Sequence, residues 1–289
     1  MDITLALGGG GVRGAAHIGV LRVLARHGFH VRAVAGTSIG SVVGAFYAFG
    51  YTPDEIENLF ASVDFSRLLY GWPLVDGPGL LGIRGITDFL RTNLGNRNFE
   101  DLTMPCAAVA VDMNSRRAII LQKGQVVDAL LGSIAIPGIF PPKEYDPYRL
   151  TDGGTLDPVP VRAARAMSPG LPVVAVTLNP PLEQPSTPLN LPILGPKTLV
   201  EQFARLNLTQ AFRVFGEAID IGQRELTELR LKIDRPDVII SPSVGEIGLL
   251  DSVNVGEVVK LGEIAALEAL PALKYAVSWR SRLARSLRH

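Results

Sequence analysis

The sequence is poor in the side chains that build disulfides and zinc sites, with one cysteine and four histidines among 289 residues. A single cysteine excludes an internal disulfide and a cysteine-based zinc site. Cys106 stands in an apolar run, where a small buried side chain is expected and not a reactive thiol. The histidines form no His-Glu-x-x-His pair, so a zinc hydrolase has no support.

An excess of charge of either sign is also missing, because Lys plus Arg and Asp plus Glu each number 28. Binding nucleic acid over a whole chain needs a basic surface that displaces counterions from phosphates, so this class is excluded. No run of about 18 apolar residues is present, which excludes a spanning helix. The first residues enter a strand-like run without a basic stretch and predict no secretory leader. We therefore expect a cytoplasmic protein.

Apolar residues (47%) and glycine (30 residues) are plentiful, and the glycines cluster. The first fifty residues alternate strand and helix patterns, which is typical of an α/β fold with a parallel sheet. Without an internal repeat or a convincing linker, we expect one domain over residues 1–289, with a motif-bearing core at 2–180 and a helical part at 197–289.

The expected elements follow hydrophobic periodicity and the positions of glycine and proline. Strands are expected at 2–7, 31–36, 105–112, 117–122, 172–178 and 237–241, with a short one before Asp152. Helices are expected at 14–27, 42–49, from 52, and at 86–94, 126–135, 161–167, 197–232 and 254–287. Segments 71–85 and 180–196 are rich in glycine or proline and are expected to be irregular.

The first glycine box, Gly8 to Gly11 with Gly14, lies between a strand and a helix. It matches G-x-G-x-x-G, but the end of the second strand lacks the acid that holds a ribose, and the Lys-Ser/Thr of a P-loop is missing. Consecutive glycines before a helix let backbone N–H groups surround a negative charge, such as a phosphate or a transient oxyanion. A tight turn without a ligand is the alternative.

The second box, Gly36-Thr37-Ser38-Ile39-Gly40, is G-x-S-x-G between a strand and a helix, the setting of a nucleophilic serine. The alternative is that Ser38 caps the helix. The one histidine downstream is His289, and His17 lies upstream, where a packing role is expected. A Ser-His-Asp triad is therefore poorly supported. Asp152, followed by Gly153 and Gly154, is a candidate base or an ordinary Asx-turn.

Together the three boxes, in this order and spacing, resemble the patatin-like phospholipase family over residues 2–180. The segment Ala135 to Pro142 also looks like the proline-containing block of that family. The resemblance implies a three-layer α/β/α sandwich with a mostly parallel sheet and an acyl hydrolase without cofactor or metal. It implies that Ser38 is the nucleophile and Asp152 the general base. Backbone N–H groups of Gly9, Gly10 and Gly11 would form the oxyanion hole, with supporting roles for Arg13, Gly14, Gly36, Gly40, Gly153 and Gly154.

The expected substrate is an ester of a lipid or another ester, and the alternatives are a catalytically idle lipid-binding or regulatory protein and a nucleotide-binding protein. Apolar residues in the irregular segments suggest an acyl groove or ordinary packing: Leu80, Leu81, Ile83, Leu189, Leu191, Ile193 and Leu194. From Pro271 the chain is basic, which fits a solvated terminal helix or peripheral contact with an anionic membrane. Nothing in the pattern specifies an oligomeric state.

Overall fold

The structure is a computed structural model and describes residues 1–63, 83–181, 199–279, 281 and 285, with the backbone alone at 199–213 and 215. The expected loops at 71–85 and 180–196 lie almost wholly outside these residues. Among the apolar residues proposed for them, Ile83 is described, and it packs against Ile139 and Phe140.

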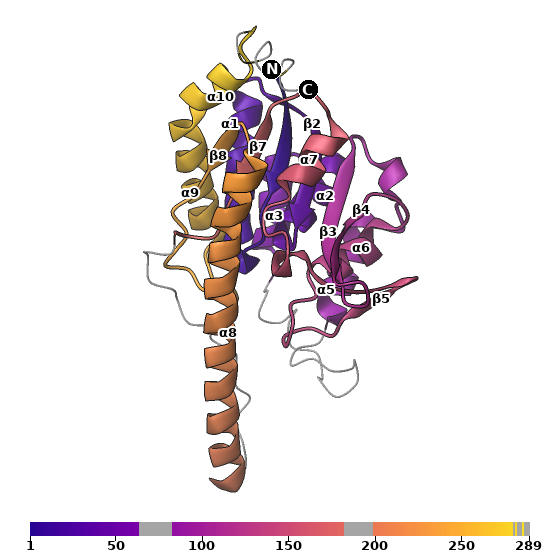
Figure 1. Cartoon of the computed structure of the whole chain (residues 1–289), viewed down its shortest axis with the longest axis vertical. Helices are drawn as coiled ribbons and strands as arrows, with labels where there is room; N and C mark the ends of the chain where they lie inside the picture. Colours follow the sequence, from indigo (N-terminus) through magenta and orange to yellow (C-terminus); the bar gives the residue numbers. More distant parts are fainter. Residues whose placement is uncertain (64–82, 182–198, 280, 282–284, 286–289) are drawn as a thin grey trace.

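The centre of the molecule is an eight-stranded sheet in the order β5-β6-β3-β2-β1-β7-β8, with β4 paired to β3. The pairs β1–β2, β1–β7, β2–β3 and β7–β8 are parallel, whereas β4, β5 and β6 add antiparallel pairs at one side (Figure 1). The strands are β1 Asp2–Leu7, β2 His30–Thr37, β3 Cys106–Asp112, β4 Arg117–Leu121, β5 Lys143–Tyr145, β6 Tyr148–Asp152, β7 Val173–Val176 and β8 Val238–Ile240. The predicted parallel α/β sheet is confirmed.

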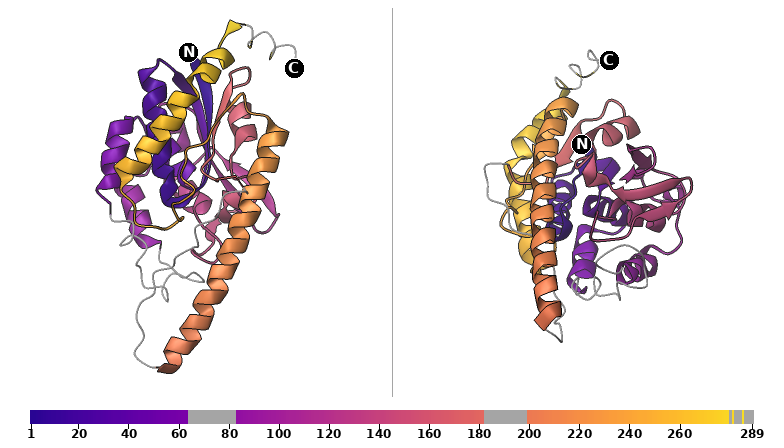
Figure 2. Two further views of the ribbon diagram at one scale, coloured as in Figure 1. Left: turned by 90° about the vertical axis from the view of Figure 1, so that its left-hand side faces the viewer. Right: turned by 60° about the horizontal axis from the view of Figure 1, so that its bottom comes forward.

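Helices cover both faces of this sheet and produce three layers, as Figures 1 and 2 show. Alternate residues of β1 explain the layers, because Leu5 and Leu7 join the larger apolar core while Ala6 joins the smaller one. The larger core holds α1 Ala15–Arg26, α2 Ile39–Phe49, α3 Pro53–Ala61, α5 Arg84–Leu94, α6 Val126–Ser133, α9 Val255–Glu268 and α10 Leu270–Ala276. The smaller core holds α7 Val161–Met167, with Leu231 of α8 Leu199–Asp234 against it.

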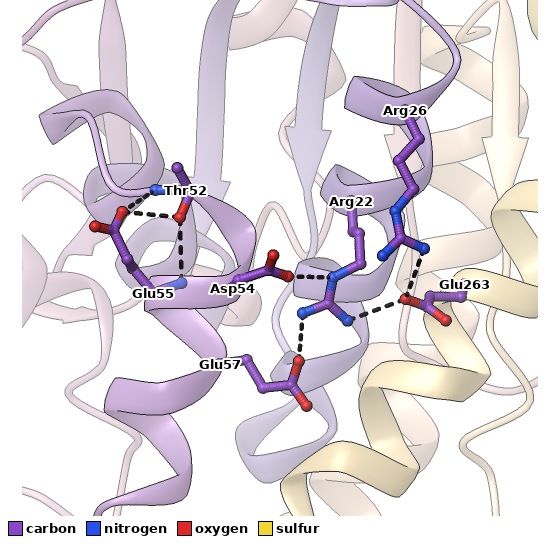
Figure 3. Close-up of polar contacts among 7 residues, drawn as sticks. All are labelled: Arg22, Arg26, Thr52, Asp54, Glu55, Glu57 and Glu263. Atoms are coloured by element: carbon purple, nitrogen blue, oxygen red, sulfur yellow. Dashed lines mark hydrogen bonds and ion pairs between the residues drawn. The ribbon is translucent and has the colours of Figure 1, made fainter.

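Helix α1 is fastened to α3 and α9 by one arginine (Figure 3). Arg22 donates to Asp54 at 2.7 Å, to Glu263 at 3.0 Å and to Glu57. Thr52 and Glu55 form the capping box that starts α3. The cap hydroxyl of Thr52 and the proline in the first turn are the features from which the sequence predicts a helix start here. The backbones of α1 and α9 also approach closely, since a Cβ on Gly19 would lie 2.0 Å from the carbonyl oxygen of Val259. The helix that leads out of the first glycine box is therefore held rigidly.

Helix α8 crosses the opposite face of the sheet, and its N-terminal end projects well beyond the body (Figure 2). The C-terminal half of α8 differs from a purely apolar packing face, because several of its polar side chains are buried. These are Asp220, Arg224, Thr227 and Asp234.

The basic end of the chain is only partly described. Trp279 is 70% exposed. Arg285 is instead folded back, because its Nη1 donates to the carbonyl oxygen of Ala276 at 2.9 Å and lies 3.1 Å from Oδ1 of Asp237. Arg285 thus binds the body and is not part of a solvated or membrane-facing basic surface. Within the described residues, no helix is both long and apolar enough to cross a membrane.

Candidate active site

Ser38 stands in a sharp turn between β2 and α2, in a backbone conformation that side chains rarely adopt (φ 53°, ψ −128°). It occupies the N-cap position of α2, yet its side chain makes no capping hydrogen bond. The alternative of a helix-capping serine is therefore not supported. The backbone N–H of Ser38 donates to Oγ of Ser133 at 2.9 Å, and that hydroxyl donates to the carbonyl oxygen of Val109 at 2.6 Å.

Two glycines flank this turn because backbone atoms occupy the space of their missing side chains. A Cβ on Gly36 would lie 2.3 Å from the carbonyl oxygen of Gly40. A Cβ on Gly40 would lie 2.3 Å from the carbonyl oxygen of Leu7, the last residue of β1. The start of α2 is thereby pressed against the end of β1, where the first glycine box begins.

The first glycine box lies directly beside Ser38, since a Cβ on Gly9 would be 3.3 Å from Cβ of Ser38. The N–H of Gly9 already donates to the carbonyl oxygen of Pro158 at 3.0 Å. The N–H groups of Gly10 and Gly11 have no hydrogen-bond partner among the described residues. Of the three predicted oxyanion donors, Gly10 and Gly11 have N–H groups that are available for a ligand, whereas the N–H of Gly9 is already bonded.

A loop before α9 holds the other side of this box. Gly11 has a φ of 57°, and a Cβ on it would lie 2.0 Å from the carbonyl oxygen of Leu249. Arg13 is 1% exposed, and its Nε donates to the carbonyl oxygen of Ile247 at 2.5 Å. Gly14 is confined by the side chain of Ile39, which a Cβ would meet at 2.2 Å. Only glycine fits these contacts, and Arg13 ties the glycine box to a distant segment.

Asp152 ends β6 and is 3% exposed. Its Oδ1 accepts from the N–H of Gly154 at 2.7 Å, so one oxygen makes the Asx-turn that was the alternative role. Its Oδ2 is buried and has no hydrogen bond of standard geometry among the described residues. Burial raises the pKa of Asp152 to about 6, while contacts with the Ser38 hydroxyl and the Gly154 N–H act to lower it. A buried carboxyl beside a serine, with one oxygen available, has the arrangement of a general base.

The glycines after Asp152 keep this turn close to the sheet and to α8. A Cβ on Gly153 would lie 2.2 Å from the carbonyl oxygen of Val109. The same oxygen accepts the hydrogen bond from the hydroxyl of Ser133. A Cβ on Gly154 would lie 3.0 Å from both Oδ1 of Asp152 and Nε2 of Gln223. The structure thus brings all three predicted boxes together around Ser38 and Asp152.

The other nucleophilic and basic candidates serve packing. Nε2 of His17 lies 2.8 Å from the carbonyl oxygen of Gly8, and burial lowers the pKa of His17 to about 4. His17 therefore has the packing role that the sequence predicts. Burial raises the pKa of the Cys106 thiol to about 12, which fits an unreactive buried side chain. Among the described residues, no group of three or more His, Cys, Asp and Glu side chains is placed to hold a metal ion.

An apolar hollow opens beside Ser38. Ser38 is the one polar side chain among the described residues that line it, and Phe60, Phe89 and Phe140 contribute aromatic walls. Its lining comes from the first glycine box and the start of α1, from α2, α3 and α5, from the segment after α6, and from the loop before α9 with the first residue of α9. The sequence does not predict this hollow, because its walls come from segments far apart in the chain.

Comparison with known proteins agrees with this geometry. Residues 5–165 match the model of the family described as patatin-like phospholipase, which is more than half of the chain. The chain belongs to the patatin-like phospholipase family. The family match contains every predicted site residue, from Gly9 to Gly154.

Several relatives are similar to this patatin-like chain. An uncharacterised NTE family protein of Mycobacterium bovis is 38% identical over 180 residues, which cover 61% of this chain and 49% of that protein. The lysophospholipase NTE1 of Mycosarcoma maydis is 32% identical over 176 residues, which cover 58% of this chain and 9% of that protein. The chain spans about half the length of the mycobacterial relatives it matches.

The fold is similar to that of VipD from Legionella pneumophila, with a TM-score of 0.56 and 13% identity over 94% of this chain and 66% of that one. This likeness supports the patatin-like three-layer fold predicted from the sequence.

Proposed function

We propose that this patatin-like chain is a serine acyl hydrolase that cleaves carboxylic esters of lipids through a Ser38–Asp152 dyad. The observation that carries the proposal is the buried Asp152 carboxyl at Ser38, with one oxygen already fixed by Gly154 and the other available. The family match and the lysophospholipase among the relatives support the same class of reaction.

The reaction begins when Ser38 Oγ attacks the ester carbonyl and its proton passes to Oδ2 of Asp152. The carbonyl oxygen becomes an oxyanion, which the N–H groups of Gly10 and Gly11 stabilise, together with the N-terminus of α2. Each well-placed donor contributes about 3 kcal/mol to the transition state. The proton moves from Asp152 to the leaving alcohol as the carbon–oxygen bond breaks. The products of this step are the alcohol and an acyl-Ser38 ester.

The second step repeats the first with water as the nucleophile. Asp152 accepts a proton from the water, which attacks the acyl carbonyl through a second oxyanion. Ser38 then recovers its proton as the fatty acid leaves. The acyl chain lies in the apolar hollow during both steps, because burial of each methylene contributes about 0.8 kcal/mol.

The dyad is tested by substitution in the purified protein. Ser38→Ala and Asp152→Asn are expected to abolish hydrolysis of a lipid ester while the far-UV circular dichroism stays unchanged. A fluorophosphonate probe is expected to label the wild type and not Ser38→Ala. Asp157→Asn is the matched control, since burial also raises the pKa of Asp157 to about 6 but its carboxyl is not a contact of Ser38. This control is expected to keep most of the activity.

The outcomes separate the alternatives. Hydrolysis that persists in Ser38→Ala would contradict the dyad. A wild type that binds lipid but reacts neither with esters nor with the probe would indicate an idle binding protein. A panel of phospholipids, lysophospholipids, simple esters and thioesters of varied acyl length then identifies the substrate class.

A further inference from the structure

The polar face of α8 that is turned to the sheet contacts the site at several points. We call Asp220, Gln223, Arg224, Thr227 and Arg230 the inner face of α8; they recur every three or four residues and so share one side of the helix. Arg224 and Thr227 are 2% and 3% exposed. Because polar side chains are rarely buried unless they have partners, their burial indicates specific interactions with the body of the protein. This helix lies outside the segment that matches the family model.

Three members of the inner face contact the region around Asp152 and the neighbouring end of β7. Nε2 of Gln223 lies against Gly154, beside the Asp152 carboxyl. Arg230 donates to the carbonyl oxygen of Leu156 from Nε at 3.2 Å and from Nη2 at 3.0 Å. Thr227 accepts at 2.8 Å from Nδ2 of Asn179, which follows β7. The turn that carries the candidate base is therefore held from α8.

The other two members, Asp220 and Arg224, act through their charges on Arg13 of the first glycine box. Asp220 and Arg224 form an ion pair of 2.7 Å, and both interact electrostatically with the buried guanidinium of Arg13. Nη1 of Arg13 is buried and has no hydrogen-bond partner among the described residues. The charge of Asp220 therefore favours the charged form of this buried guanidinium, as does that of Asp251, whereas the like charge of Arg224 opposes it.

We propose that α8 is a positioning element of the active site, in which the Asp220–Arg224 pair sets the oxyanion loop through Arg13 while Gln223 and Arg230 hold the Asp152 turn. This proposal rests on the proposed hydrolase function. The two loops leave β1 and β6, which are separated in the sheet by β2 and β3. One helix that contacts the Asp152 turn and acts through charge on Arg13 links the two loops, and transition-state stabilisation depends steeply on their spacing.

Asp220→Asn tests the proposal, because it removes the charge while it keeps the shape. We expect kcat to fall about 10- to 100-fold with KM unchanged, since oxyanion donors act mainly in the transition state. The affinity for an alkyl boronic acid, which forms an anionic tetrahedral adduct with serine that mimics the intermediate, is expected to fall by a similar factor. Asp220→Glu keeps the charge and is expected to recover part of the loss.

Glu228→Gln is the matched control, because Glu228 forms an i,i+4 pair with Lys232 on the same helix, with an exposed lysine at 3.4 Å. It is expected to leave kcat and boronate affinity unchanged. Gln223→Ala is a second variant at a half-buried position, and it is expected to lower kcat several-fold without a change in Tm.

Unchanged kcat in both Asp220→Asn and Gln223→Ala would overturn the proposal, as would an equal loss in Glu228→Gln. A loss in Asp220→Asn that appears in Tm but not in boronate affinity would also overturn it. If the wild type itself is not labelled by a fluorophosphonate, the hydrolase function fails and the positioning role fails with it. Normal labelling of both the wild type and Asp220→Asn at equal rates would overturn the positioning role alone.

Discussion

The carboxyl group of Asp152 carries out its proposed chemistry only when it is ionised. Burial holds its pKa near 6, well above the ordinary value of 3.8, so the group is protonated over part of the mildly acidic range. The same burial makes the carboxylate a stronger base at neutral pH, because its conjugate acid is weaker. The buried location of Asp152 thus gives its carboxyl a pKa just below neutral pH, where the ionised form can act as a base.

A pH profile tests this assignment. We expect kcat/KM on an uncharged ester to be constant above pH 7 and to fall about tenfold per pH unit below about pH 6, as the base becomes protonated. Asp157→Asn is expected to show the same fall in kcat/KM below about pH 6, because Asp157 is not the proposed base even though burial raises its pKa as well. A profile that stays flat down to pH 4 would show that Asp152 is not the base.

Ser133 is a residue-scale feature that the sequence does not reveal. It is fully buried, and its hydroxyl accepts from the N–H of Ser38. It stands in an ordinary helical pattern, with no motif around it. Its partner is 95 positions away, so no local signal exists.

Ser133→Ala is expected to lower the free energy of unfolding by about 1–3 kcal/mol, because the buried N–H of Ser38 loses its acceptor. Labelling by a fluorophosphonate is expected to slow as the turn relaxes. Ser41→Ala is the control, since the Ser41 hydroxyl donates to the carbonyl oxygen of Ser38, which also accepts backbone bonds from Ser41 and Val42. Urea unfolding compares the two variants, and equal losses would speak against a special role for Ser133.

At the scale of elements, the positions of strands and helices follow from local sequence signals, namely hydrophobic periodicity and the placement of glycine, proline and capping residues. The expected strand at 2–7 coincides with β1, and the expected helix from 52 begins with the predicted proline and cap. Segment 143–145 forms β5, which the sequence does not predict, because three residues give no periodicity. Helix α8 is predicted as a long helix, but its buried polar face is not, since hydrophobic periodicity registers only apolar contacts.

The ion-pair cluster of Arg22 gives a prediction at this scale. Arg22→Ala leaves Asp54, Glu57 and Glu263 without their common partner, and we expect a loss of about 1–3 kcal/mol in unfolding free energy, smaller in high salt. Arg26→Ala is the control, because its side chain is 66% exposed and forms a weak ion pair, with Nη1 as far as 4.0 Å from Oε1 of Glu263. Chemical denaturation at two salt concentrations checks both variants, and an equal effect in the two would contradict a joining role for Arg22.

For the whole molecule, the site could be predicted because each glycine box lies next to its chemical group in the chain. Gly36 and Gly40 flank Ser38, and Gly153 follows Asp152, so a local pattern identifies each one. What brings the boxes together is not local. The carbonyl oxygens of Leu249 and Ile247 accept hydrogen bonds from the first box, although they lie far along the chain. The inner face of α8 contacts the turn of Asp152.

The long-range contacts of the turn at Ser38 also have a consequence for the order in which activity appears during synthesis. The segment from β1 to α2 contains the strained serine, but Ser38 is held by Ser133, 95 positions later, and Thr37 donates to the carbonyl oxygen of Asp157, 120 positions later. A chain emerging from its N-terminus acquires these partners late. Nascent protein is therefore expected to react with a fluorophosphonate only after most of the sheet has formed.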